Sequence, residues 1–200
     1  FGAWPGGRLV VHAEAMIDEP RPSLLKILIV STWRTYCGIA SYTRDLARAL
    51  VKLGHHVVVL AEEGVGGDPN EDGFDVPYIE CWRRDITGYD ALIRTVEQEQ
   101  PDVVSIQHEY GLFPDSTAFE DLVKKLRAKT CVTVTMHTVS SDGRGAGTEH
   151  DRRCAFSADA VVVHSWAGLD ALGKPIHRAI PVVHIPHGTS EGCTPMDPVA

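Results

Sequence analysis

The sequence predicts an α/β fold in which helices cover both faces of a mostly parallel sheet. Three observations support this prediction. Short apolar runs of strand length alternate with segments whose apolar residues recur at helical spacing. The apolar runs are continuous, as expected for strands that are buried on both faces. The 200-residue chain is 44% hydrophobic and 23% charged, so it carries enough apolar surface for one substantial core.

The alternation begins with a strand, a helix and a second strand. The first strand is expected at 27–30 (ILIV), and the helix at 39–54, where Gly54 ends it. The second strand is expected at 56–61 (HVVVLA). A loop rich in Gly, Asp and Pro follows at 62–76.

The same pattern continues through the rest of the chain. Five further strands are expected at 76–81, 102–107, 131–136, 158–164 and 180–185. A helical stripe of Tyr89, Leu92, Ile93 and Val96 ends before Pro101. Ser116 and Ser165 are the expected N-caps of two later helices, and a short helix is expected near 149–156. Such alternation predicts one Rossmann-like domain of six or seven strands, joined by right-handed crossovers.

Composition and charge exclude several classes of protein. Nineteen Lys and Arg against 27 Asp and Glu give a net charge of −8, which argues against a nucleic-acid partner. No apolar stretch approaches the roughly 18 residues of a transmembrane segment. The five cysteines are an odd number without a Cys-x-x-Cys pair, which argues against a disulfide framework or a zinc site. We therefore expect a cytoplasmic protein with reduced thiols, and leave open a peripheral position at a membrane.

In a parallel sheet of this kind, ligands bind outside the carboxyl ends of the strands. The loop after the first strand, 32–41 (TWRTYCGIAS), lacks both Gly-x-Gly-x-x-Gly and the Lys of a phosphate-binding loop. It keeps Gly38 at the start of a helix, whose free N–H groups can bind an anion. Tight packing between strand and helix is the alternative reason for this glycine.

Polar residues follow two later strands at the same edge. His108, Glu109 and Tyr110 follow the fourth strand and fit either a pocket floor or a structural role. His137 follows the fifth strand and could face the same crevice or bond the adjoining backbone. His108, Glu109 and His137 could together form a site of two histidines and one carboxylate, but nothing in the sequence fixes their geometry. We expect no metal ion, and we expect His184 and His187 to be structural or loop residues.

Several motifs in order resemble a known family. The opening KILIVSTW…CGIASYTRDLARALVKLGHHVVVLAE is followed by QHEYGLFP, VTVTMHT, ADAVVVHS and IPHG, over residues 26–189. This series resembles the retaining glycosyltransferases of family 4, which have the two-domain GT-B fold. The resemblance implies that the chain is the N-terminal, acceptor-side domain, one half of a GT-B fold. Its implied partners are a nucleotide-sugar donor, a sugar or glycolipid-type acceptor, and its own C-terminal domain.

The resemblance also implies roles for individual residues. His137 matches the family histidine that lies against the transferred sugar, and is the expected catalytic residue. Gly38 and Ile39 match the loop that contacts the donor phosphate or the acceptor. His108, Glu109 and Tyr110 match the acceptor-side motif. The implied transfer proceeds with retention, uses the leaving phosphate as base, and needs no cofactor or metal.

Two features depart from the family pattern. Cys37-Gly38 stands where the family usually has two glycines, and the chain stops at Ala200. We expect an N-terminal extension or linker over 1–25, the Rossmann-like glycosyltransferase domain over 26–190, and the start of a linker to an absent C-terminal domain over 191–200. These 200 residues are then expected to be inactive alone. Two alternatives remain: a stand-alone domain that binds a sugar or nucleotide, and a metal-dependent hydrolase.

Overall fold

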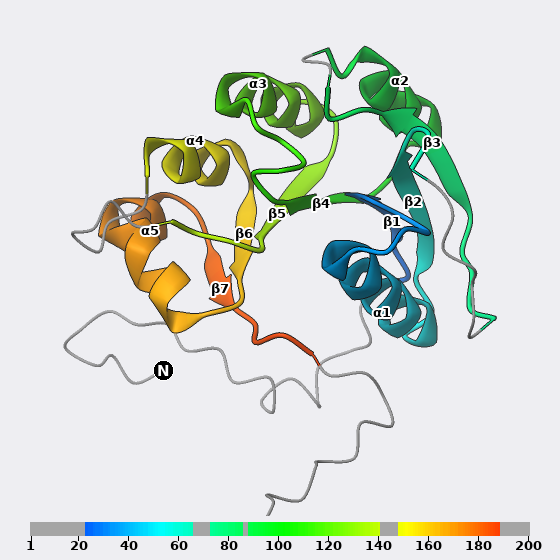
Figure 1. The fold of residues 1–200 in the computed structure, drawn as a ribbon, viewed down its shortest axis with the longest axis horizontal. Helices are drawn as coiled ribbons and strands as arrows, with labels where there is room; N and C mark the ends of the chain where they lie inside the picture. The colour runs from blue at the N-terminus through cyan, green and yellow to red at the C-terminus, as the bar shows by residue number, and fades with distance from the viewer. Residues whose placement is uncertain (1–22, 66–72, 86–87, 141–147, 189–200) are drawn as a thin grey trace, which may run out of the picture.

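The fold is a seven-stranded sheet with helices on both sides (Figure 1). The computed structural model describes residues 23–65, 73–85, 88–140 and 148–188. The strands are β1 (Lys26–Ser31), β2 (His56–Glu62), β3 (Tyr78–Trp82), β4 (Val103–His108), β5 (Cys131–Met136), β6 (Ala160–Val163) and β7 (Val182–His184). The helices are α1 (Gly38–Lys52), α2 (Asp90–Glu99), α3 (Ser116–Arg127), α4 (Glu149–Ser157) and α5 (Trp166–Ala179).

Every strand pairing is parallel, and the strand order is β3-β2-β1-β4-β5-β6-β7. The predicted Rossmann-like class is confirmed, and the sheet has seven strands, the larger of the two numbers predicted. The order reverses between β1 and β4, so the ligand crevice of such a sheet is expected outside the carboxyl ends of these two strands. The proposed extension over 1–25 and linker over 191–200 lie outside the described residues, apart from 23–25, and these boundaries remain predictions.

Side chains of β1 and β2 alternate between two cores. Ile27 and Ile29 of β1 join the smaller core, which α1 covers through Ala47. Leu28 and Val30 join the larger core, to which α2, α3, α4 and α5 all contribute. Figure 1 shows α1 on one side of the sheet, with α2, α3 and α4 on the other. Burial on both faces explains why the strands are continuously apolar.

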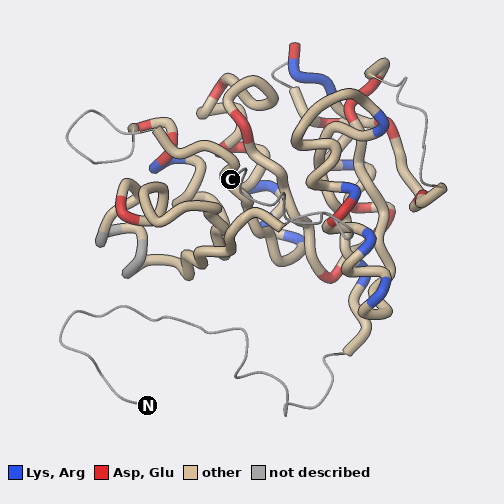
Figure 2. Tube along the Cα trace, turned by 60° about the horizontal axis from the view of Figure 1, so that its bottom comes forward, with Lys and Arg blue, Asp and Glu red and all other residues tan. Residues whose placement is uncertain are grey.

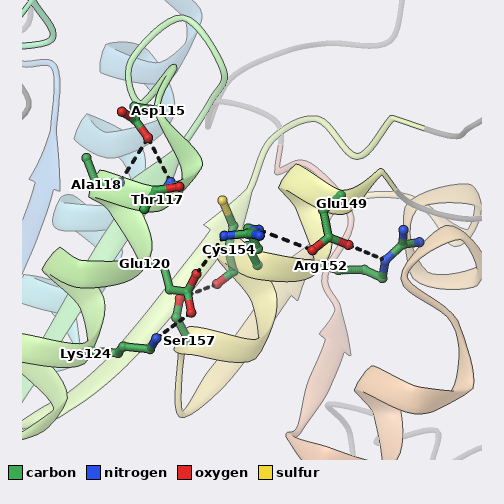
Figure 3. Close-up of polar contacts among 10 residues, drawn as sticks. Asp115, Thr117, Ala118, Glu120, Lys124, Glu149, Arg152, Cys154 and Ser157 are labelled. Carbon is green, nitrogen blue, oxygen red and sulfur yellow. Dashed lines mark hydrogen bonds and ion pairs between the residues drawn. The ribbon is translucent and has the colours of Figure 1, made fainter.

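The ends of the helices follow local chemistry. Gly54 has a φ of 93°, a left-handed conformation that suits glycine and terminates α1 as predicted. Ser165 caps α5 as predicted, since its hydroxyl accepts a hydrogen bond from the Gly168 N–H at 3.0 Å. The predicted cap Ser116 is wrong by one residue: Asp115 is the N-cap of α3 and accepts from the N–H groups of Thr117 and Ala118 (Figure 3).

Acidic and basic residues are interspersed over the fold rather than gathered by sign (Figure 2). Many of them pair across elements, such as Lys129 with Glu97 and Arg127 with Asp159. Among the described residues, no helix has both the length and the apolar character that crossing a membrane requires.

Candidate functional site

Three histidines that follow three neighbouring strands meet at the carboxyl edge of the sheet. His137 follows β5, His164 follows β6 and His187 follows β7. The ring centroids of His164 and His187 are 3.9 Å apart, and those of His137 and His164 are 5.1 Å apart. Parallel strands end at a common edge, so residues from distant parts of the sequence come together there. We call these three residues the edge histidines.

Tyr42 of α1 packs against all three edge histidines. Its ring lies edge-on to them, with centroid distances of 4.8 Å to His137, 5.0 Å to His164 and 5.9 Å to His187. Burial raises the pKa of the Tyr42 phenol, so it stays protonated at neutral pH. Tyr42, one turn after Gly38, therefore connects the N-terminal part of α1 to the edge histidines.

The hydrogen bonds of His137 fix its tautomer. The amide group of Gln107 donates to the Ser105 hydroxyl at 3.2 Å, so its oxygen faces Nε2 of His137 at 3.0 Å. An amide oxygen only accepts, so Nε2 carries the proton and Nδ1 keeps its lone pair. Burial, together with the nearby His164 and His187, lowers the pKa of His137 to about 4. The imidazole is therefore neutral at pH 7.

His164 is held in the same way by the backbone. Its Nδ1 donates to the carbonyl oxygen of Ile185 at 2.8 Å, and its Nε2 is buried with no hydrogen-bond partner. Burial lowers the pKa of His164, although the bond to Ile185 opposes the shift. His184 has the structural role expected of it, because it donates to the His164 carbonyl at 3.3 Å and packs on Trp166. His187, by contrast, belongs to the site and not to a passive loop.

Gly38 opens α1 at a position with free space. A Cβ atom added there would meet no described atom within 4 Å, so tight packing is not the reason for this glycine. No side chain caps α1, and its first turn holds no acidic residue. The Ile39 side chain packs against the core, which leaves its backbone N–H as the group that can face a ligand.

Cys37 precedes this open turn. Burial acts to raise the pKa of its thiol, but the N–H groups of Ile39 and Ala40, the Thr32 hydroxyl and Arg84 outweigh that effect and lower the pKa. The N-terminal turn of α1 thus stabilises negative charge at Cys37, which is the property that an anion-binding helix end requires.

The last residue of β4, His108, and the two that follow it are engaged with the protein itself. The His108 side chain is fully buried between Phe113 and Phe119. Glu109 accepts hydrogen bonds from the Tyr110 N–H at 3.0 Å and from the Thr138 hydroxyl at 2.8 Å. These contacts tie the loop after β4 to the loop after β5.

Tyr110 extends the same connection to α4. Its hydroxyl donates to Asp151 and accepts from the Ser140 N–H at 3.1 Å. Asp151 also completes the capping box of α4 with Thr148. The loop next to His137 is therefore braced from two sides.

Histidine-rich groups of possible metal ligands occur twice among the described residues. One consists of the edge histidines, and the other of His108, His150 and Cys154; in each, the ligand atoms lie within 4.8 Å of one another. The combination of His108, Glu109 and His137 considered from the sequence is not assembled, because His108 turns into the core.

A small pocket lies beside α1 on its own face of the sheet. Its lining includes Trp33, Arg34, Arg44, Phe74 and Asp75. Arg34 pairs with Asp75 at 3.8 Å, but Nε of Arg44 and the indole N–H of Trp33 are buried without a hydrogen-bond partner. Arg34 also has a positive φ of 51°, which is uncommon outside glycine. Two unpartnered donors, one of them cationic, suit an anionic group.

The parallel sheet and the family match given below define a glycosyltransferase domain of the GT-B type. Anabaena HepE, solved in complex with UDP-glucose, shares the fold at a TM-score of 0.52 and 15% identity, over 82% of this chain and 44% of that one. The model of Glycosyltransferase Family 4 matches residues 36–189, and the chain belongs to that family.

A second solved structure is also similar. MurG of Acinetobacter baumannii aligns with a TM-score of 0.46 and 13% identity, over 70% of this chain and 40% of that one. No curated protein matches the chain. The chain spans less than half the length of these two solved structures.

Proposed function

We propose that this domain is the acceptor-side half of a retaining glycosyltransferase, which moves a sugar from a nucleotide-sugar donor to a sugar or glycolipid-type acceptor. The observation that carries the proposal is the juxtaposition of the open first turn of α1 with the neutral His137. Tyr42 lies one turn along α1 from Gly38, and its ring centroid is 4.8 Å from that of His137. Turnover then requires the second domain of the GT-B fold.

His137 is the proposed catalytic residue because its neutral form suits the reaction. Glycosyl transfer passes through an oxocarbenium-like state, in which positive charge builds up on the sugar ring. A protonated imidazole would oppose that charge, whereas a neutral ring with a fixed dipole can stabilise it. Gln107 holds Nε2–H, and the lone pair at Nδ1 can accept a hydrogen bond from a sugar hydroxyl.

Gly38 and Ile39 are the proposed contacts for the diphosphate of the donor. The first-turn N–H groups of α1 and its dipole favour an anion, and the free space at Gly38 lets a phosphate approach the backbone. The leaving phosphate serves as the base in the proposed reaction, which therefore needs no metal ion for the transfer itself.

The acceptor side is proposed to lie at the pocket of Trp33 and Arg44. His108 is buried, and Glu109 and Tyr110 act by positioning the loop beside His137 rather than by presenting free donors. The unpartnered donors of Trp33 and Arg44 instead favour an acceptor that carries a phosphate or carboxylate group.

The test is turnover by the full-length protein with a panel of nucleotide sugars. We expect release of nucleoside diphosphate that depends on an acceptor, and a product whose anomeric configuration matches that of the donor. An inverted product would contradict the retaining mechanism. Tight binding of a nucleotide sugar without release, across acceptors with and without an anionic group, would instead support a binding module.

A further inference from the structure

A second cluster of possible ligands lies inside the domain, away from the edge histidines. His108 ends β4, while His150 and Cys154 lie one turn apart on α4. Nε2 of His108 is 3.3 Å from Nε2 of His150 and 3.4 Å from Sγ of Cys154. His108 and Cys154 are fully buried, and His150 is half-buried.

Hydrogen bonding alone does not satisfy this cluster. Nε2 of His108 faces two partners, and it has either one proton to donate or one lone pair to offer. It can therefore form one full hydrogen bond and not two. A cation at the centre of the cluster would instead accept one lone pair from each of the three atoms.

The distances match those around a tetrahedral zinc ion. Bonds of about 2.0–2.1 Å to nitrogen and about 2.3 Å to sulfur place neighbouring ligand atoms roughly 3.3–3.6 Å apart. The two short separations at His108 fall in this range. All three atoms already lie within 4.8 Å of one another, so the separation of His150 from Cys154 is at most about 1.2 Å longer than the zinc geometry requires.

We propose that His108, His150 and Cys154 bind a Zn²⁺ ion, with a solvent molecule as the fourth ligand. A thiolate with two imidazoles is a ligand set that zinc accepts. On binding, a Zn–S bond replaces the S–H bond of Cys154, and the proton leaves to solvent. The packing of His108 against Phe113 and Phe119 fixes the orientation of its ring.

The ion would have a structural role. It would join α4 to the end of β4, next to the bond between Tyr110 and Asp151 that braces the loop after β5. Glu120 of α3 also pairs with Arg153 of α4 at 3.6 Å; Figure 3 shows Glu120 facing α4 near Ser157. The metal would thus complete the attachment of α4, independently of the transfer chemistry proposed above.

The test is Co²⁺ binding by the full-length protein after removal of metal with EDTA. We expect a tetrahedral cobalt spectrum with a thiolate-to-cobalt charge-transfer band, which Zn²⁺ displaces. Cys154→Ser should abolish the charge-transfer band, whereas Cys81→Ser, a change at another buried cysteine, should leave it intact. His150→Ala should weaken Co²⁺ binding by about tenfold or more.

Four results would overturn the proposal: no tetrahedral spectrum, a charge-transfer band that survives in Cys154→Ser, unchanged binding by His150→Ala, or loss of binding in His164→Ala. His150 is only half-buried, so its variant decides the matter if Cys154→Ser fails to fold. His164→Ala, at the edge histidines, should bind Co²⁺ like the unmodified protein. Loss of binding in that variant would place the metal at the other cluster. None of these measurements depends on a sugar substrate.

Discussion

At the scale of single residues, His137 is the proposed catalytic group, and its substitution distinguishes a catalytic role from a purely structural one. In the full-length protein, His137→Ala should reduce turnover by about 10²-fold, since it removes a group that acts in the transition state. KM should change little, because ground-state binding does not depend on that interaction. Turnover, KM and melting temperature are to be measured on one preparation.

The matched control is His56→Ala, a change at an exposed histidine at the opposite end of the sheet. It should leave all three quantities near those of the unmodified protein. If His137→Ala instead lowers only the melting temperature and keeps near-normal turnover, His137 supports the loop and is not catalytic.

Arg44 tests the proposed acceptor pocket. Arg44→Gln removes the charge of a guanidinium whose buried Nε has no hydrogen-bond partner among the described residues, so we expect KM for an anionic acceptor to rise by about tenfold, equivalent to about 1.4 kcal/mol. KM for the donor should stay constant. Arg94→Gln, at an exposed position on α2, serves as control. An unchanged acceptor KM in Arg44→Gln would move the acceptor elsewhere.

The sequence predicts the place of His137 at the sheet edge but not its neighbours there, and its catalytic role stays a prediction. His137 stands out because it follows a buried strand at the ligand edge. His164 directly follows the next strand, β6, so the same reasoning predicts that it lies at the ligand edge. Tyr42 is one of the apolar residues at helical spacing in α1, and that spacing predicts only burial. Its contact with the histidines that follow β5 and β6 is seen only in the folded structure. His108 shows the converse, since a strand-end position does not determine which way a side chain turns.

The cap of α3 is a prediction at the scale of elements. Asp115→Ala removes an acceptor shared by the N–H groups of Thr117 and Ala118, and should lower the free energy of unfolding by about 1 kcal/mol. Ser116→Ala should cost less, because Ser116 lies inside the helix. Urea unfolding of both variants measures the difference, and a larger loss for Ser116→Ala would show that the helix starts one residue later.

All seven strands could be predicted from their apolar runs, and the main helices from apolar residues at helical spacing. Their ends were harder to place. Asp115 and Ser116 are both good caps, and only the extended backbone of Asp115 (φ −95°, ψ 102°) decides between them. The break in α5 at Gly173, where φ is 76° and ψ is 169°, was also missed. A glycine within a helical pattern gives little indication of its conformation.

Acid should destabilise the molecule as a whole. The pKa of His137 is about 4 in the folded state, against an ordinary value of 6.5, because burial and then His164 and His187 disfavour its charged form. The unfolded chain therefore binds the proton first, so the stabilisation is full above about pH 6.5 and is lost as the pH falls towards 4. Burial shifts the pKa of His164 in the same direction.

Urea unfolding of EDTA-treated protein between pH 7 and 4 measures this loss. Carboxylates also titrate in this range, so the informative comparison is with His137→Gln, which should depend less steeply on pH. Equal slopes for the two proteins would show that His137 is not held neutral by the fold.

The central claim for the whole molecule is that the first turn of α1 receives the donor diphosphate beside His137. Gly38→Asp tests it most directly, since the position has room for a side chain and the new carboxylate would compete with the phosphate. The measurement is the Kd of the full-length protein for its nucleotide sugar, with Gly38→Ala as the control that adds a Cβ without charge. We predict that Gly38→Asp weakens binding by about tenfold or more at an unchanged melting temperature, and more than Gly38→Ala does. Equal affinity in Gly38→Asp and the unmodified protein would contradict the account.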